Sequence, residues 1–177
     1  MTDIMVDLET LDTRQTATIL SIGACRIDWT TGEIVDPFYI VVDSQSCLDI
    51  GLTESASTRQ FWDKQGPEAR KVFTDPNVPI QVALADFGSY LRRFGIKSVE
   101  LWGNGSDFDN TILTNAYDKC GLRAPWMFYN NRCFRTLRKT VGRNAIEPIR
   151  EGTHHNALDD AIYQAKILLS LKEQMGR

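Results

Sequence analysis

The chain has 177 residues, of which 42% are hydrophobic and 24% charged, and its formal net charge is −3. This length and composition favour one globular domain over residues 1–177 with a substantial core. The acidic balance argues against a protein that holds its partners by bulk positive charge, and no apolar run approaches membrane-spanning length. The four scattered cysteines lack disulfide or zinc spacing, so we expect a cytoplasmic protein with reduced thiols.

The first part of the chain predicts three antiparallel strands. Apolar residues alternate with others from Ile4 onward, so Asp7 and Glu9 leave the same face of a first strand. Residues 17–28 and 37–43 read as the second and third strands, with a turn signal at Gly32 between them. Short connections between three strands favour an antiparallel meander. A polar loop over residues 44–57 follows.

The remainder of the chain alternates helices with strands. Apolar spacing typical of helices, with closing glycines in two of them, predicts helices over residues 58–66, 67–73, 79–95, 109–121, 134–142 and 156–174. Further strands are predicted over residues 98–104 and 126–129. This order predicts an α/β fold with a mixed five-stranded sheet, an antiparallel meander plus parallel strands, flanked by helices.

The paired carboxylates of the first strand need an explanation. Two like charges about 4 Å apart repel by roughly 4 kcal/mol at an effective dielectric constant near 20. Asp7 and Glu9 either splay into solvent at a sheet edge or share a divalent cation, for which hard oxygen ligands are the natural partners. The choice depends on whether further carboxylates come from elsewhere in the chain.

Two later clusters supply such carboxylates. Asp107 and Asp109 stand where a predicted strand ends and a helix begins, and one of them can serve as an N-cap. The second cluster contains both histidines of the chain and opens the last helix. There Asn156 and Asp159 resemble a capping box, which leaves Asp160 without a structural role.

A basic run lies between Arg132 and Arg150, with Glu147 as its one acid. Such a run forms either a solvated helix face or a contact surface for phosphate groups.

The segments "DLET", "FDNTIL" and "HNALDDA" resemble the three exonuclease motifs of the DEDDh 3′–5′ exonucleases. With "WGNGSDFDNTIL" and "FRTL", the chain is most similar to the small phage and bacterial branch of exodeoxyribonuclease VIII-like and ribonuclease T-like proteins. The resemblance implies a ribonuclease H-like fold and 3′–5′ exonuclease activity in a bacterial cell or phage-infected host. Relatives are often homodimers, so a homodimer is one option here.

The resemblance also assigns roles to individual residues. Asp7, Glu9, Asp109 and Asp160 would hold two divalent cations, Mg²⁺ or Mn²⁺, and His155 would act as the general base. His155 is selected over His154 because the motif H-x-A-x-x-D requires alanine at position 157. One departure is Thr13, which stands where relatives often carry an apolar wedge.

The expected substrate is the 3′ end of single-stranded DNA or RNA or a 3′ overhang, with release of nucleoside 5′-monophosphates. Trp62 is either a base-stacking side chain or part of the core, and Phe61 is assigned to the core. An oligonucleotide-clearing ribonuclease and a catalytically weak binding module with a nuclease fold remain as alternatives. The candidate substrate-binding residues are Thr10, Leu11, Trp62, Asn104, Phe108, Arg132 and Arg135.

Overall fold

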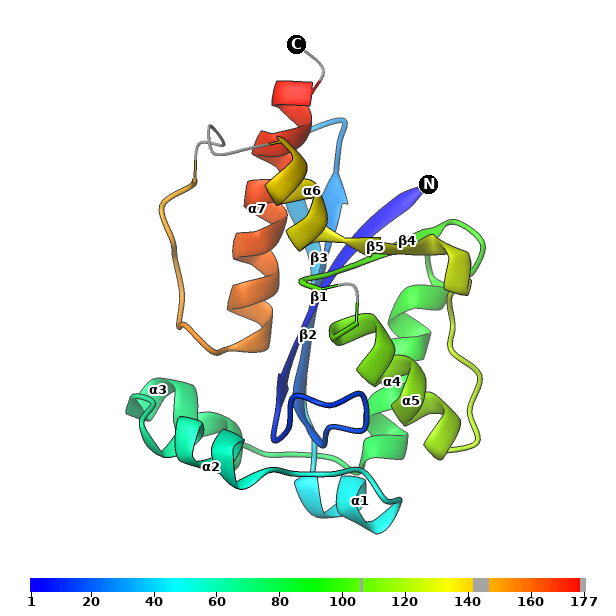
Figure 1. Ribbon diagram of the computed structural model, residues 1–177. Coiled ribbons are helices and arrows are strands. Elements are labelled where there is room, and N and C mark those ends of the chain that lie inside the picture. Colours follow the sequence, from blue (N-terminus) through cyan, green and yellow to red (C-terminus); the bar gives the residue numbers. More distant parts are fainter. Residues whose placement is uncertain (106, 142–146, 176–177) are drawn as a thin grey trace.

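A five-stranded sheet with the order β3-β2-β1-β4-β5 runs through the middle of the molecule (Figure 1). The computed structural model describes residues 1–105, 107–141 and 147–175, so the expected helix end at residue 142 and Arg143 of the basic run lie outside it. The first three strands pair antiparallel, whereas β4 and β5 add parallel to β1. The predicted mixed sheet is therefore confirmed. The strands are β1 (Thr2–Thr10), β2 (Ile19–Asp28), β3 (Glu33–Val41), β4 (Val99–Gly103) and β5 (Asn131–Cys133).

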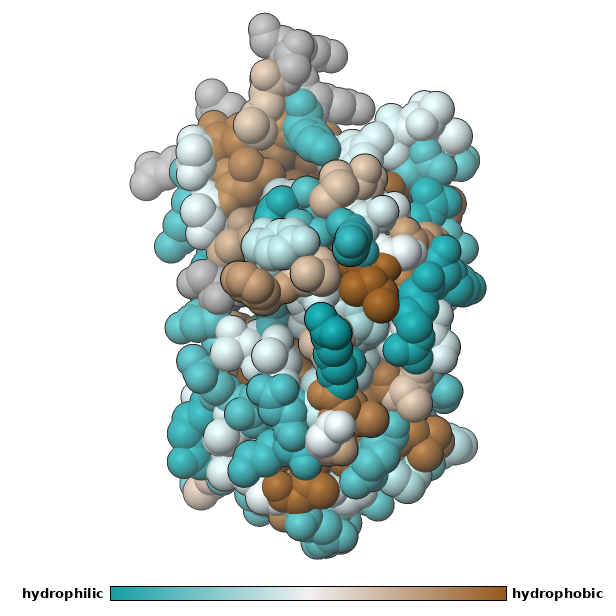
Figure 2. Space-filling view, turned by 90° about the vertical axis from the view of Figure 1, so that its right-hand side faces the viewer, coloured by the Kyte–Doolittle hydropathy of each residue, from teal (hydrophilic) through white to brown (hydrophobic). Residues whose placement is uncertain are grey.

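Helices cover both faces of this sheet, with α6 and α7 on one side and α4 and α5 on the other (Figure 1). None of the described helices is both long and apolar enough to cross a membrane. On the side seen in Figure 2, hydrophobic residues lie in separate patches among hydrophilic ones. The helices are α1 (Ser44–Asp49), α2 (Ala56–Asp63), α3 (Pro67–Arg70), α4 (Ile80–Arg92), α5 (Asp109–Lys119), α6 (Phe134–Val141) and α7 (Ala157–Met175), with 3₁₀ turns at Lys71–Phe73 and Phe128–Asn130.

The alternation along β1 divides the core into two layers. Ile4, Val6 and Leu8 are buried with residues of α4 and α5 on one face. Met5 is buried with residues of α6 and α7 on the other. Because side chains two apart share a face, the carboxylates that follow Met5 along β1 point toward α7. The strand that forms the centre of the sheet thus carries the acidic pair.

The predicted strand over residues 37–43 begins earlier than expected, at Glu33. A register shift between Ala24 and Arg26 of β2 and a positive φ of 51° at Asp36 form a local irregularity in β3. Pro37 is compatible with this strand because β3 lies at the sheet edge, where a missing N–H costs little. The sequence pattern that predicts this strand therefore breaks off at the residues where the backbone departs from regular pairing.

Two other expectations were wrong. The loop expected over residues 44–57 contains α1 and the start of α2, whose first turns are capped by the side chains of Asp43 and Ser55. The strand expected over residues 126–129 is absent, because Phe128 and Tyr129 are 81% and 57% exposed and belong to a 3₁₀ turn. The next three residues instead pair with β4. The aromatic residues of this segment gave it the composition of a buried strand, which led to the wrong prediction.

Candidate active site

Asp7 and Glu9 lie near the carboxyl end of β1 and face the first turns of α7. Glu9 is 8% exposed. Asp7 accepts a hydrogen bond through Oδ1 from Nε2 of Gln164 in α7, at 2.6 Å. The acidic pair is therefore turned inward, and the prediction that both carboxylates share one face agrees with the strand geometry.

Asp160 joins this pair from the first turn of α7. One carboxylate oxygen from each of Asp7, Glu9 and Asp160 lies within 4.8 Å of the other two. Asp160 Oδ2 accepts the backbone N–H of His155 at 3.0 Å, and Asp160 Oδ1 forms an ion pair with Arg150. Acids that lie more than 150 positions apart in the chain thus converge.

Asp109 is the first residue of α5 and is 1% exposed. Its Oδ1 accepts the backbone N–H of Leu8 at 3.1 Å, and its Oδ2 accepts that of Asn104 at 2.7 Å. A Cβ added at Gly103 would lie 3.0 Å from Asp109 Cβ, so glycine at that position permits the close approach of β4 and α5. Asp107 is exposed in the preceding loop, which agrees with the choice of Asp109 as the site residue.

Burial and mutual repulsion raise the carboxyl pKa values at this cluster. Burial, followed by the charge of Asp109, raises the pKa of Glu9 to about 8 and that of Asp7 well above its ordinary value. Burial also raises the pKa of Asp109 to about 6, although the backbone donors of Asn104 and Leu8 lower it. The metal-free cluster therefore holds protons that a bound cation would displace.

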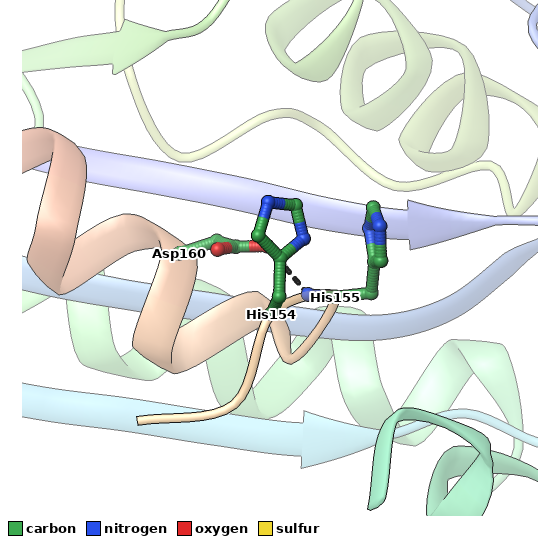
Figure 3. A group of neighbouring side chains, drawn as sticks. All are labelled: His154, His155 and Asp160. Atoms are coloured by element: carbon green, nitrogen blue, oxygen red, sulfur yellow. Dashed lines mark hydrogen bonds between the residues drawn. The ribbon is translucent and has the colours of Figure 1, made fainter. Parts of the chain in front are cut away.

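His155 precedes α7 and lies beside the acids, with a left-handed φ of 64°. Figure 3 shows its imidazole next to that of His154, and the ring centroids are 4.1 Å apart. The ring also meets Phe61 edge-on, at 5.0 Å between centroids. Partial burial, followed by the nearby charges of His154 and Arg150, lowers the pKa of His155. At neutral pH the imidazole is neutral and able to accept a proton.

A cavity of about 840 Å³ opens over these groups, and Asp7, Glu9, His155 and Asp160 line it, whereas Asp109 lies behind the lining. The candidate substrate residues Thr10, Trp62, Asn104 and Phe108 are also in its wall.

The two aromatic residues of α2 exchange the roles expected from the sequence. Trp62 is 2% exposed, and its indole N–H donates to the carbonyl of Thr10 at 2.9 Å, so it fixes the end of β1. Phe61, which was assigned to the core, is 41% exposed in the cavity wall. Phe61, and not Trp62, therefore presents an exposed ring to the cavity.

Three other candidate substrate residues lie outside the cavity lining. Leu11 is 1% exposed in a core cluster beneath α2. Arg132 forms an ion pair with Glu100 at 2.7 Å and does not reach the cavity. Arg135 is directed at the loop around Gly105, where an added Cβ would lie 3.6 Å from its Nη1. Among the described residues, the arginines that line the cavity are Arg138 and Arg150.

Sequence reasoning missed Gln164, which holds Asp7. It stands four positions after Asp160 in α7, a spacing that places both side chains on one helix face, so the signal was present. Arg150 was named only as the end of the basic run, and nothing in the sequence indicated its contact with Asp160. Tyr163, whose ring lies 4.6 Å from the Arg150 guanidinium carbon, was likewise not found.

Comparisons with known proteins identify the family of the chain. The family model described as the 3′–5′ exoribonuclease Rv2179c-like domain matches residues 2–171. The exodeoxyribonuclease of Enterobacteria phage T4 is 26% identical over 161 residues, covering 77% of this chain and 70% of that protein.

Solved structures share the fold. The nuclease domain of 3′hExo, described as a DEDDh family member bound to rAMP, has a TM-score of 0.60 at 17% identity, covering 97% of this chain and 92% of the other. E. coli exonuclease I in complex with a dT13 oligonucleotide has a TM-score of 0.69 at 15% identity, covering 99% of this chain and 42% of the other. These likenesses confirm the ribonuclease H-like fold. The chain therefore belongs to the 3′–5′ exoribonuclease Rv2179c-like domain family and is a 3′–5′ exonuclease.

Proposed function

We propose that residues 1–177 act as one exonuclease domain that removes nucleotides from the 3′ end of single-stranded nucleic acid or a 3′ overhang and releases nucleoside 5′-monophosphates. The observation that carries this proposal is the convergence of Asp7, Glu9 and Asp160, whose ligand oxygens lie within 4.8 Å of one another at a cavity. Buried acids with raised pKa values gain most from a bound cation, which removes both their repulsion and their protons.

The residues fit a site for two divalent cations, Mg²⁺ or Mn²⁺, because the donor set consists of carboxylate oxygens. Asp7, Glu9 and Asp160 are the ligands exposed to the cavity, and Asp109 keeps free lone pairs on oxygens that each accept one backbone N–H. Such cations stabilise negative charge on a phosphodiester and lower the pKa of water.

His155 is proposed as the group that takes the proton from the attacking water. Its lowered pKa keeps the imidazole neutral near pH 7, and it lines the same cavity as the acids. Phe61, edge-on to His155 and exposed, is placed to stack on a base of the strand end. Arg138 lies in the same wall, where its guanidinium pairs with Glu147 and can exchange that carboxylate for a phosphate of the strand.

The relatives include proteins named for RNA and proteins named for DNA. The family description names an exoribonuclease, whereas the phage T4 relative is an exodeoxyribonuclease. One solved relative holds rAMP and another a dT13 oligonucleotide. Both RNA and DNA strands are therefore needed as substrates in the test.

The test uses single-stranded DNA and RNA labelled at either end and incubated with Mg²⁺ or Mn²⁺. Strands labelled at the 5′ end should give a ladder of shortened products, whereas strands labelled at the 3′ end should release a labelled mononucleotide at once. Asp7→Asn should lower the rate by about 100-fold or more, since loss of even a residue behind a metal ligand costs about 10- to 100-fold.

The matched control is Asp107→Asn, which changes an exposed acid outside the cavity lining and should leave the rate unchanged. Binding of labelled strands without any metal-dependent shortening would contradict the proposal and support a nuclease-fold binding module.

A further inference from the structure

His154 has no assigned part in the proposed reaction, but it lies next to His155 and Asp160, which both have one. One ligand atom from each of His154, His155 and Asp160 lies within 4.8 Å of the other two. Figure 3 shows the Asp160 carboxylate directed toward the two imidazole rings. His154 is an exposed side chain in the cavity wall, so an ion can reach the group from solvent.

The backbone holds the two histidines on the same side. His155 has a φ of 64°, a left-handed conformation that is uncommon for non-glycine residues, although histidine adopts it more often than most. Its N–H donates to Asp160 Oδ2, which ties the turn to the carboxylate. The resulting ring contact, 4.1 Å between centroids, brings two imidazoles that are adjacent in sequence over one acid.

Two imidazole nitrogens and one carboxylate oxygen differ chemically from the neighbouring all-carboxylate cluster. Mg²⁺ prefers oxygen ligands and keeps much of its water, so it gains little from imidazole. Zn²⁺ binds histidine nitrogen readily and forms four-coordinate sites with three protein ligands and one water. The donor set therefore discriminates between a transition-metal ion and Mg²⁺.

We propose that His154, His155 and Asp160 form an inhibitory site for a Zn²⁺-like transition-metal ion. Because this proposal deepens the proposed function, it rests on His155 acting as the base. An ion bound there occupies the lone pair of the His155 imidazole and withdraws Asp160 from the carboxylate cluster. It must also replace Arg150 as the partner of Asp160, which limits its affinity.

The first test is calorimetric titration of the metal-free protein with Zn²⁺, a readout that does not need nuclease activity. The parent should bind Zn²⁺, and His154→Gln should weaken the affinity by at least about tenfold, since direct ligands contribute more than the partners behind them. Asp7→Asn should retain Zn²⁺ binding, because Asp7 is not among the three ligands.

The second test measures Mg²⁺-supported hydrolysis with increasing Zn²⁺. The parent should be inhibited by Zn²⁺, and His154→Gln, compared with its own rate without Zn²⁺, should resist that inhibition. His155→Gln should lose both the activity and the tight Zn²⁺ binding. Equal Zn²⁺ affinity in the parent and His154→Gln would overturn the site, whereas a Zn²⁺ site in a protein without nuclease activity would overturn only the proposed function.

Discussion

Arg150 supplies the positive charge that the acidic cluster uses in the absence of metal. Its guanidinium forms an ion pair with Asp160, and its charge lowers the pKa values of Asp7 and Glu9. The ring of Tyr163 lies 4.6 Å from the guanidinium carbon and supports it. Among the described residues, the buried Nε of Arg150 has no hydrogen-bond partner. A cation entering the cluster must therefore compete with this side chain.

We expect Arg150→Gln to bind Mn²⁺ more tightly than the parent. Arg150 and Asp160 are mostly buried, and even the contribution of an exposed ion pair, about 1 kcal/mol, corresponds to about fivefold in metal affinity. Calorimetric titration with Mn²⁺ measures the change. Arg138→Gln is the control, because Arg138 pairs with Glu147 elsewhere in the cavity wall. Unchanged or weaker Mn²⁺ binding by Arg150→Gln would contradict the competition.

The sequence predicted the positions of the acids better than those of the substrate residues. Strand alternation alone placed Asp7 and Glu9 on one face, because that pattern depends only on neighbours. The partner of Arg132 is Glu100, 32 positions away, and their contact depends on the register between β4 and β5. Such long-range pairs decide which basic side chains remain available for phosphate, and local patterns do not contain them.

The contact between α7 and β2 positions the acid that α7 carries. Gly23 of β2 lies so close to the helix start that an added Cβ would come within 2.1 Å of the Ala157 carbonyl carbon. The helix can therefore begin directly over the sheet, three residues before Asp160. A side chain at Gly23 would move the helix start, and Asp160 with it, away from β1.

Gly23→Ala should lower both stability and nuclease activity. Overpacking typically costs about 1–3 kcal/mol, and here the clash is with backbone atoms that cannot rotate away. Chemical denaturation gives the stability, and the exonuclease rate reports the displacement of Asp160. Gly66→Ala, where an added Cβ meets nothing within 4 Å, should change neither quantity. If Gly23→Ala and the parent had equal exonuclease rates and equal denaturation midpoints, the proposed displacement of the start of α7 would be wrong.

Long elements were predictable from their periodicity, whereas short ones were not. The helix expected over residues 156–174 is α7, Ala157–Met175, because its apolar face repeats over many turns. The three-residue β5 has no pattern of its own and is defined only by pairing with β4. α1, at six residues, is too short to be read from periodicity and is fixed by the cap at Asp43.

The burial of several acids at one site makes the stability of the protein depend on pH. Glu9 has a folded-state pKa of about 8 against an ordinary value of 4.5, so between these values the folded protein holds a proton that the unfolded chain has lost. The free energy of unfolding therefore falls as pH rises through this window. The lowered pKa of His155 acts in the opposite direction, but only below its ordinary value of 6.5.

Between pH 6.5 and pH 8 we therefore expect the melting temperature of the metal-free protein, measured in chelator, to fall. Mg²⁺ replaces the protons, so the increase in melting temperature that it produces should be larger at pH 8 than at pH 6.5. Glu9→Gln, which removes one titrating group while keeping its shape, should flatten the metal-free profile and reduce the Mg²⁺ effect. A metal-free melting temperature that rises over this interval in the parent would contradict the inward, shared burial of these carboxyl groups.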